Sequence, residues 1–297
     1  MPLSNPLAHP FLAPLGWTLV GLFASSLVAL LLTVHGRWQL LNGSVLFRRW
    51  RTWLLIAPLF SLVALTGPLT VAIFAVAVAL QGSREYARLA GLRLSDTAVL
   101  LLVSVAGPVA ALLLPPDKLA LGLLVLPLLA SLPALLSQDT PAGATRMTRL
   151  GFGLWYLPAS LSIMVMLARH PHGGPGLLLA LGLAVGMSDV AAFTVGRLIG
   201  GPKLAPRLSP SKTWAGVAGN VLGAALGLLL LRDLTPVSPL LVAIVALGAV
   251  WGDLVESLLK REAGAKDAGA CLPGFGGLLD RVDSLLVVLP LVYVVLP

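Results

Sequence analysis

The 297-residue chain has little charge and almost no cysteine. Only 11% of its residues are charged, against roughly 25% in soluble domains, whereas 58% are hydrophobic and the mean hydropathy is +0.96. Its one cysteine, Cys271, excludes a framework of disulfides within the chain. The N-terminal residues lack the basic start of a secretory signal peptide, so we expect the first apolar run to remain as an anchor.

Apolar runs of about 20 residues, the length that a helix needs to cross a bilayer, recur along the chain. The sequence therefore predicts an all-α, polytopic integral membrane protein with about nine or ten transmembrane helices. Seven runs are of spanning length: 17–34, 97–114, 119–136, 150–168, 175–196, 213–231 and 237–258. We expect the run 52–81 to cross twice with a turn at Gly67-Pro68, or to form a re-entrant hairpin. A last, short run covers 285–297.

Basic residues gather in the segments between these runs, and the positive-inside tendency places such segments in the cytoplasm, with both termini outside. The segments are 37–51, 82–96, 137–149, 197–212 and 259–281. We expect residues 1–150 to form N-terminal transmembrane helices, and 151–297 a C-terminal catalytic region with cytoplasmic loops 197–212 and 259–281. The net charge of +8 suits anionic membrane lipids or phosphorylated substrates. The scattering of basic residues over short loops argues against a nucleic acid partner.

Half of the twelve acidic residues lie in one short stretch near the C-terminal end. They are Asp253, Glu256, Glu262, Asp267, Asp280 and Asp283, and they alternate with Lys260, Arg261, Lys266 and Arg281. Charge beside or inside a bilayer is costly and usually marks a functional site. Carboxylates bind Mg²⁺, and Lys and Arg bind phosphate, so this stretch predicts a bound metal and a bound anion in one place.

Helical spacing places some of these acids on common faces. Glu256 and Ser257 lie three and four residues after Asp253, and Asp283 lies three residues after Asp280, at the start of the last helix. We predict that Asp253, Asp280 and Asp283 hold one or two cations. Two structural alternatives remain open: an intramembrane partner that neutralises Asp253, and ordinary helix N-terminal acids at Asp280 and Asp283.

The segment 200–213 combines glycine and proline, which favour a loop, with basic and hydroxyl side chains. These side chains are Lys203, Arg207, Ser209, Ser211, Lys212 and Thr213. Thr213 is expected to open the next helix, whose N-terminal dipole favours an anion. The pattern predicts a cradle for a triphosphate, and a basic loop that only obeys the topology rule is the alternative. Asp189 either belongs to the same site or is an interfacial acid paired with Arg197.

The C-terminal part of the chain resembles the phosphatidate cytidylyltransferase family, also called CDP-diacylglycerol synthases. The residues that match the family signature are Ser257, Lys260-Arg261, Lys266-Asp267, Pro273-Gly274, Gly276-Gly277 and Asp280-Arg281-x-Asp283. Upstream, Ser209-Pro210-x-Lys212-Thr213-Trp214 and Asp189 with Gly196-Arg197 also match family patterns. The resemblance is specific over about 187–284, with a weak echo at Arg84-Glu85-Tyr86. One departure is Phe275, which stands where the family has a histidine and can neither ligate a metal nor titrate.

The resemblance implies transfer of the cytidylyl group of CTP to phosphatidate, giving CDP-diacylglycerol and pyrophosphate for phospholipid synthesis. It implies a bacterial cytoplasmic membrane with the site facing the cytoplasm, and Mg²⁺ as cofactor; a second, monovalent cation and a homodimer stay open. It implies catalytic roles for Asp253, Asp280, Asp283, Lys266 and Asp267. It implies substrate binding by Asp189, Lys203, Arg207, Ser209, Lys212, Thr213, Ser257, Lys260, Arg261 and Arg281.

Three other functions are open at this point. A related CTP-dependent enzyme that acts on another lipid phosphate, or on a lipid alcohol as a polyprenol kinase does, would keep the metal-binding acids and change the acceptor. A non-catalytic homologue would rest on Phe275 alone. An ion-coupled transporter also uses intramembrane acids, but these lie near the middle of the membrane and have no adjoining basic loops.

Overall fold

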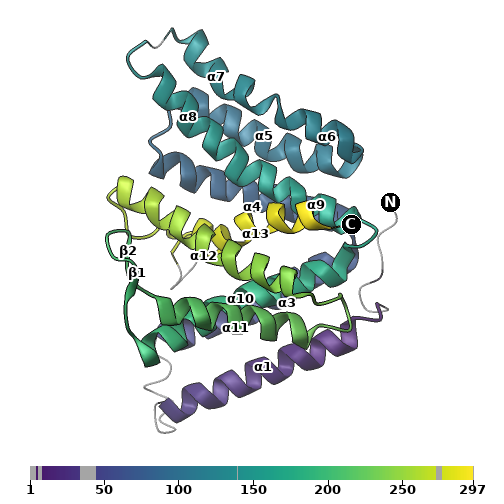
Figure 1. The fold of residues 1–297 in the computed structure, drawn as a ribbon. Helices are drawn as coiled ribbons and strands as arrows, with labels where there is room; N and C mark the ends of the chain where they lie inside the picture. The colour runs from purple at the N-terminus through teal and green to yellow at the C-terminus, as the bar shows by residue number, and fades with distance from the viewer. Residues whose placement is uncertain (1–4, 6–8, 34–44, 139, 272–275, 297) are drawn as a thin grey trace.

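The computed structural model describes residues 5, 9–33, 45–138, 140–271 and 276–296, which form a bundle of helices with one short β-hairpin (Figure 1). In chain order the helices of the first half are α1 Leu12–Thr33, α3 Val45–Thr66, α4 Pro68–Leu89, α5 Leu94–Leu113, α6 Pro116–Leu123, α7 Leu126–Leu136 and α8 Gly143–Leu154. A π-helical turn, η2 Trp155–Ala159, continues into α9 Ser160–Arg169. The second half contains α10 Gly174–Ile199, α11 Trp214–Leu230, α12 Pro239–Glu262 and α13 Leu279–Val295. The prediction of an all-α fold is confirmed.

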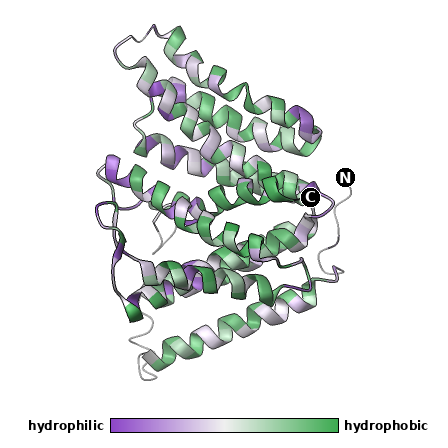
Figure 2. Cartoon of the chain, viewed as in Figure 1, coloured by the Kyte–Doolittle hydropathy of each residue, from purple (hydrophilic) through white to green (hydrophobic). Residues whose placement is uncertain are grey.

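Apolar residues run along most of the helices (Figure 2), and many large apolar side chains, such as Leu102, Leu136 and Leu198, are exposed, as they must be where a helix faces lipid tails. Within the described residues, six helical stretches are long and apolar enough to cross a membrane: Leu12–Leu32, Leu94–Leu113, Pro116–Leu136, Gly143–Arg169, Gly174–Ile199 and Pro239–Glu262. Two shorter apolar helices are Trp50–Thr66 and Trp214–Leu230. The protein is therefore an integral membrane protein. The number of crossings stays a prediction.

The long run 52–81 is broken at Gly67, between α3 and α4. Gly67 has φ 121° and ψ −178°, a backbone conformation that favours glycine. Pro68 follows at the first position of α4, where the missing N–H costs no helical hydrogen bond. The turn predicted at Gly67-Pro68 is confirmed, whereas the double crossing of the membrane is not tested.

The segment predicted as a loop over 200–213 contains a two-stranded antiparallel hairpin, so that prediction was wrong in detail. Strand β1 is Lys203–Ala205 and strand β2 is Ser209–Thr213, with Lys203 opposite Thr213. Both strands are edges, so the proline inside β2 is tolerated without loss of a central ladder bond. The prediction that Thr213 opens the next helix is confirmed, because its hydroxyl caps α11 by accepting from the Gly216 N–H at 3.1 Å.

Small residues let neighbouring helices approach closely, as is common between membrane helices. On α11, a Cβ added at Gly219 would lie 2.6 Å from the Ala191 carbonyl oxygen of α10, and one at Gly223 would overlap the Met187 carbonyl. On α12, a Cβ added at Gly248 would lie 2.8 Å from the Val288 side chain of α13. The pairs α10–α11 and α12–α13 are therefore packed almost backbone to backbone.

A buried ion pair joins α5 to α8 away from these pairs. Arg146 donates to the two carboxylate oxygens of Asp96 at 3.0 and 2.7 Å, and both side chains are buried. Removing one partner of such a pair leaves the other charge buried, at a cost of about 3–5 kcal/mol. We expect Asp96→Asn to lower the thermal unfolding midpoint in detergent while activity per folded molecule is kept. An unchanged midpoint would show that the pair does not stabilise the fold.

Candidate active site

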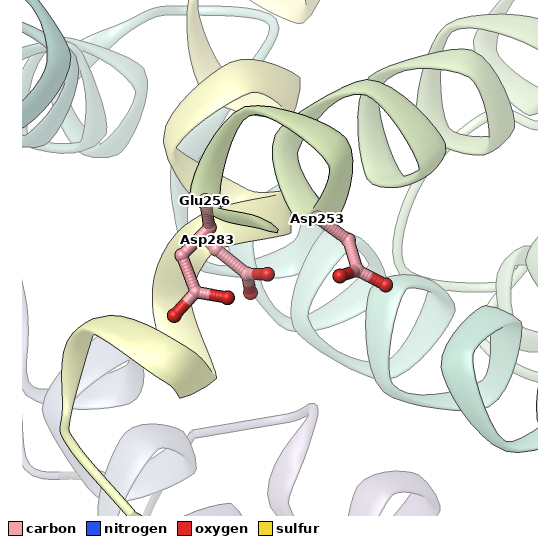
Figure 3. A group of neighbouring side chains, drawn as sticks. All are labelled: Asp253, Glu256 and Asp283. Carbon is pink, nitrogen blue, oxygen red and sulfur yellow. The ribbon is translucent and has the colours of Figure 1, made fainter. Parts of the chain in front are cut away.

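Three carboxylates meet where α12 packs on α13. Asp253 and Glu256 project from α12 and Asp283 from α13, toward the same side of the pair (Figure 3). One oxygen from each side chain lies within 4.8 Å of the others. Glu256 and Asp283 are buried and Asp253 is half-buried. We call Asp253, Glu256 and Asp283 the acid trio; its spacing and oxygen donors are those of a site for a hard cation.

The trio forms because two helix backbones nearly touch. A Cβ added at Gly252 would overlap the Asp283 carbonyl oxygen and lie 2.7 Å from the Ser284 Cα. The Ser284 hydroxyl donates to the Ala249 carbonyl at 3.2 Å, which fixes the two helices one turn away from the trio. Asp253 is next to Gly252 in the chain, so the close crossing brings its side chain within reach of Asp283.

Two lysines flank the trio. Lys212, at the end of β2, places its Nζ 2.5 Å from an Asp253 oxygen. Lys260, one turn beyond Glu256 on α12, donates to Glu256 Oε2 at 2.6 Å and to Asp280 Oδ1 at 2.8 Å. The second Glu256 oxygen, Oε1, is buried without a hydrogen-bond partner among the described residues. An unsatisfied buried carboxylate oxygen is costly, so this atom fits the ligand of a cation.

Asp280 faces the loop before α13 instead of the trio. Its Oδ2 accepts from the backbone N–H groups of Ala268 at 2.9 Å and Gly277 at 2.7 Å, and its Oδ1 accepts from Lys260. The carboxylate thereby ties the glycine-rich loop to the start of the helix. The role of Asp280 as a metal ligand stays a prediction. For a cation to bind at Oδ1, the hydrogen bond from Lys260 would have to break.

The remaining predicted site residues lie on α10, α12, the hairpin and the loop before α13. Asp189 on α10 is accessible and lies in electrostatic range of Asp253, Lys212 and Arg281, so the structure brings it to the trio. Arg261 donates to the Leu208 carbonyl at 3.2 Å and joins α12 to the hairpin. Ser209 and Ser257 are half-buried, whereas Lys203, Arg207, Lys266 and Asp267 are exposed on the hairpin and the loop. Phe275 lies outside the described residues.

Three residues of the site were not in the predicted set. Glu256 shared a helix face with Asp253 in the sequence, which was the signal that pointed to it. Glu85 belonged only to the weak echo Arg84-Glu85-Tyr86, and its carboxylate accepts from the first N–H groups of α13. Tyr156 had no signal: it is fully buried in η2, and its hydroxyl has no hydrogen-bond partner in the described structure. It lies in electrostatic range of the trio, in a π-helical turn of the kind often found at functional sites.

Comparison with known proteins finds a family model and several relatives that match this chain. Residues 47–297 match the model of the cytidylyltransferase family. The chain is 42% identical over 147 residues to a phosphatidate cytidylyltransferase of Brucella suis, covering 48% of this chain and 54% of that protein. It is 35% identical over 230 residues to the one of Pseudomonas aeruginosa, covering 74% of this chain and 84% of that protein. The match with Mycobacterium leprae is 42% over 136 residues, with 44% and 43% covered. The chain thus spans about half the length of the first and third of these relatives.

Proposed function

Because the chain belongs to the cytidylyltransferase family, we propose that it transfers the cytidylyl group of CTP to phosphatidate, giving CDP-diacylglycerol and pyrophosphate. The observation that carries this proposal is the acid trio with Lys212 and Lys260 beside it. Carboxylates for a cation and lysines for phosphate are what a reaction between two phosphorylated substrates requires. The named relatives are phosphatidate cytidylyltransferases, which supports phosphatidate over another acceptor.

The acid trio fits Mg²⁺, the cofactor that the family resemblance implies. Its oxygens lie within 4.8 Å of one another, and Glu256 Oε1 is buried without a partner in the described residues. Bound there, the cation would supply charge neutralisation for the phosphate oxygens of both substrates. Asp189 lies at the edge of this site and is the carboxylate to which a second, monovalent cation would bind.

The chain's own residues then position the reactants. The phosphate of phosphatidate is already an anion, so the reaction needs no strong general base. A phosphate oxygen of the lipid attacks the α-phosphorus of CTP, and the bond from that phosphorus to the β-phosphate oxygen breaks, so pyrophosphate leaves. Lys212, Lys260 and Arg281 bring positive charge to this point, and preorganised charge is an effective form of catalysis. The N-terminus of α11, capped by Thr213, adds backbone N–H groups beside Lys212.

The remaining basic side chains would hold the outer phosphates of CTP. Lys203 and Arg207 on the hairpin and Lys266 on the loop before α13 are exposed. The hairpin lies beside the polar end of α12 (Figures 1 and 2), where Arg261 donates to the Leu208 carbonyl. We place this end in the cytoplasm of a bacterium, where CTP is available, with the lipid entering sideways from the inner leaflet. The predicted homodimer stays a prediction.

In this reaction, we expect the Tyr156 hydroxyl to donate a hydrogen bond to a phosphate oxygen or to water at the trio. We expect Tyr156→Phe to lower kcat/KM about 10- to 100-fold, the value of a hydrogen bond to a charged group. The unfolding midpoint should stay unchanged, because the hydroxyl has no partner within the described fold to lose. Tyr86→Phe is the matched control: its hydroxyl donates to the Arg149 carbonyl at 2.6 Å, so stability should fall and kcat/KM should not. Equal kcat/KM for wild type and Tyr156→Phe would refute this role.

A two-product assay tests the reaction itself. The purified protein, in detergent with added lipid, receives CTP labelled in the cytosine ring, Mg²⁺ and phosphatidate, and CDP-lipid and pyrophosphate are followed together. We expect equal amounts of both products, and neither once a chelator is added. A parallel reaction offers a polyprenol in place of phosphatidate. Release of CDP with a phosphorylated polyprenol would overturn the proposal in favour of a kinase, and no product from folded protein would favour a non-catalytic homologue.

A further inference from the structure

A carboxylate from the first half of the chain lies at the start of α13. Glu85, on α4, is fully buried. Its Oε1 accepts from the Leu278 N–H at 3.1 Å, and its Oε2 accepts from the Leu279 N–H at 2.8 Å, across 193 and 194 positions of sequence. The first N–H groups of a helix have no partner within it, and the leucine at the N-cap of α13 has no side chain that can accept. Glu85 therefore caps the helix from outside.

The loop before α13 packs on the same carboxylate. A Cβ added at Gly269 would lie 2.9 Å from Glu85 Oε1, and one at Gly277 would lie 2.6 Å from Oε2. The Gln81 side chain, one turn earlier on α4, donates to Oε1 at 2.9 Å and orients the carboxylate. The positive end of the α13 dipole adds to the stabilisation of this buried negative charge.

The capped turn is the one that carries the acids of the site. Asp280 follows Leu279 directly and binds the loop through Gly277 N–H, and Asp283 lies three residues further. Rotation or fraying of this turn would move Asp283 away from Asp253 and Glu256. A helix end is where fraying occurs first, so a cap at this place controls the geometry of the trio.

We propose that Glu85 is a positioning residue of the active site, which holds the first turn of α13 so that Asp283 faces Asp253 and Glu256. It acts through the helix backbone and touches no substrate. The inference deepens the proposed function and rests on it for its catalytic meaning. The cap itself can be tested without any substrate or metal.

The first test is amide hydrogen exchange of metal-free protein, read over residues 276–285. We expect Glu85→Ala to speed exchange at Leu278 and Leu279 about ten-fold or more, the value of a charge-assisted hydrogen bond. Glu85→Gln, which keeps one carbonyl acceptor and the side-chain volume, should give a smaller change and serves if the alanine variant fails to fold. Asp96→Asn is the matched control, a buried acid on α5 whose loss should leave this segment's exchange unchanged. Unchanged exchange in both Glu85 variants would overturn the inference.

The second test is Mn²⁺ binding, measured by electron paramagnetic resonance, together with the Mg²⁺ concentration that half-activates turnover. We expect Glu85→Gln to weaken Mn²⁺ binding and to raise the Mg²⁺ requirement about ten-fold, as loss of an orienting partner does, with kcat recovering at high Mg²⁺. Asp96→Asn should change neither. Unchanged Mn²⁺ affinity in Glu85→Gln would overturn the inference. Wild type without turnover, but with Mn²⁺ binding that Glu85→Gln weakens, would support the inference and contradict the proposed function.

Discussion

Asp283→Asn is expected to lower turnover about 100- to 1,000-fold, the cost of removing one preorganised charge from such a site. The substitution keeps the shape of the side chain and removes a negative charge that is buried next to Asp253 and Glu256. When no cation is bound, the buried negative charge of Asp283 destabilises the folded state. The variant should therefore unfold at the same temperature as wild type or at a higher one. Initial rates at saturating CTP and phosphatidate, with a thermal scan in detergent, measure both effects.

Asp233→Asn is the control for this substitution. Asp233 is an exposed acid in the turn between α11 and α12, next to Arg232, so its loss should change neither rate nor midpoint. Turnover of Asp283→Asn within a few-fold of wild type would show that the trio does not serve the reaction.

Gly252→Val is expected to have the largest effect on packing. The added side chain would overlap the Asp283 carbonyl and the Ser284 Cα, so α12 and α13 must separate. Overpacking of this kind costs about 1–3 kcal/mol, and separation also draws Asp253 away from Asp283. We expect a lower unfolding midpoint and less than about a tenth of wild-type turnover, since a displacement of about 1 Å near reacting groups already costs about 100-fold. Both quantities are measured on protein purified in the folded state.

Gly21→Val on α1 is the matched control, because a Cβ at Gly21 meets nothing within 4 Å. It introduces the same residue into a helix interior without a packing conflict. A Gly252→Val variant that matches Gly21→Val in midpoint and turnover would show that the close crossing of α12 and α13 is dispensable.

Much of the fold was predictable because helices that cross a membrane are visible in the sequence as apolar runs of about 20 residues. The break at Gly67-Pro68 and the cap at Thr213 were also predictable, since each depends on residues adjacent in the chain. The hairpin over 203–213 was not predictable. Glycine, proline and charged residues in this part of the sequence favour a loop, whereas the strands depend on backbone hydrogen bonds between β1 and β2. Local sequence does not record that pairing.

Only those residues of the site that lie close together in the sequence could be grouped in advance, from their spacing along a helix. The three-residue spacing of Asp253 and Glu256 predicted that they share a helix face, and the cluster of acidic and basic residues pointed to Asp283 as a further member of the site. Spacing also grouped Asp280 with Asp283, yet the structure turns Asp280 toward Lys260 and the loop, because backbone N–H groups and a lysine compete for it. Glu85 and Tyr156 come from distant helices, so only the packing of α4 and η2 against the C-terminal helices reveals them.

The measurement that tests the central claim most directly is Mn²⁺ binding to the purified protein without CTP or lipid. The acid trio predicts saturable binding by wild type and by Asp233→Asn. Glu256→Gln and Asp283→Asn should each weaken it at least about ten-fold, because loss of an outer-shell partner alone costs 10- to 100-fold in metal affinity. Binding by both variants as tight as that of wild type would contradict the assignment of the cation to Asp253, Glu256 and Asp283.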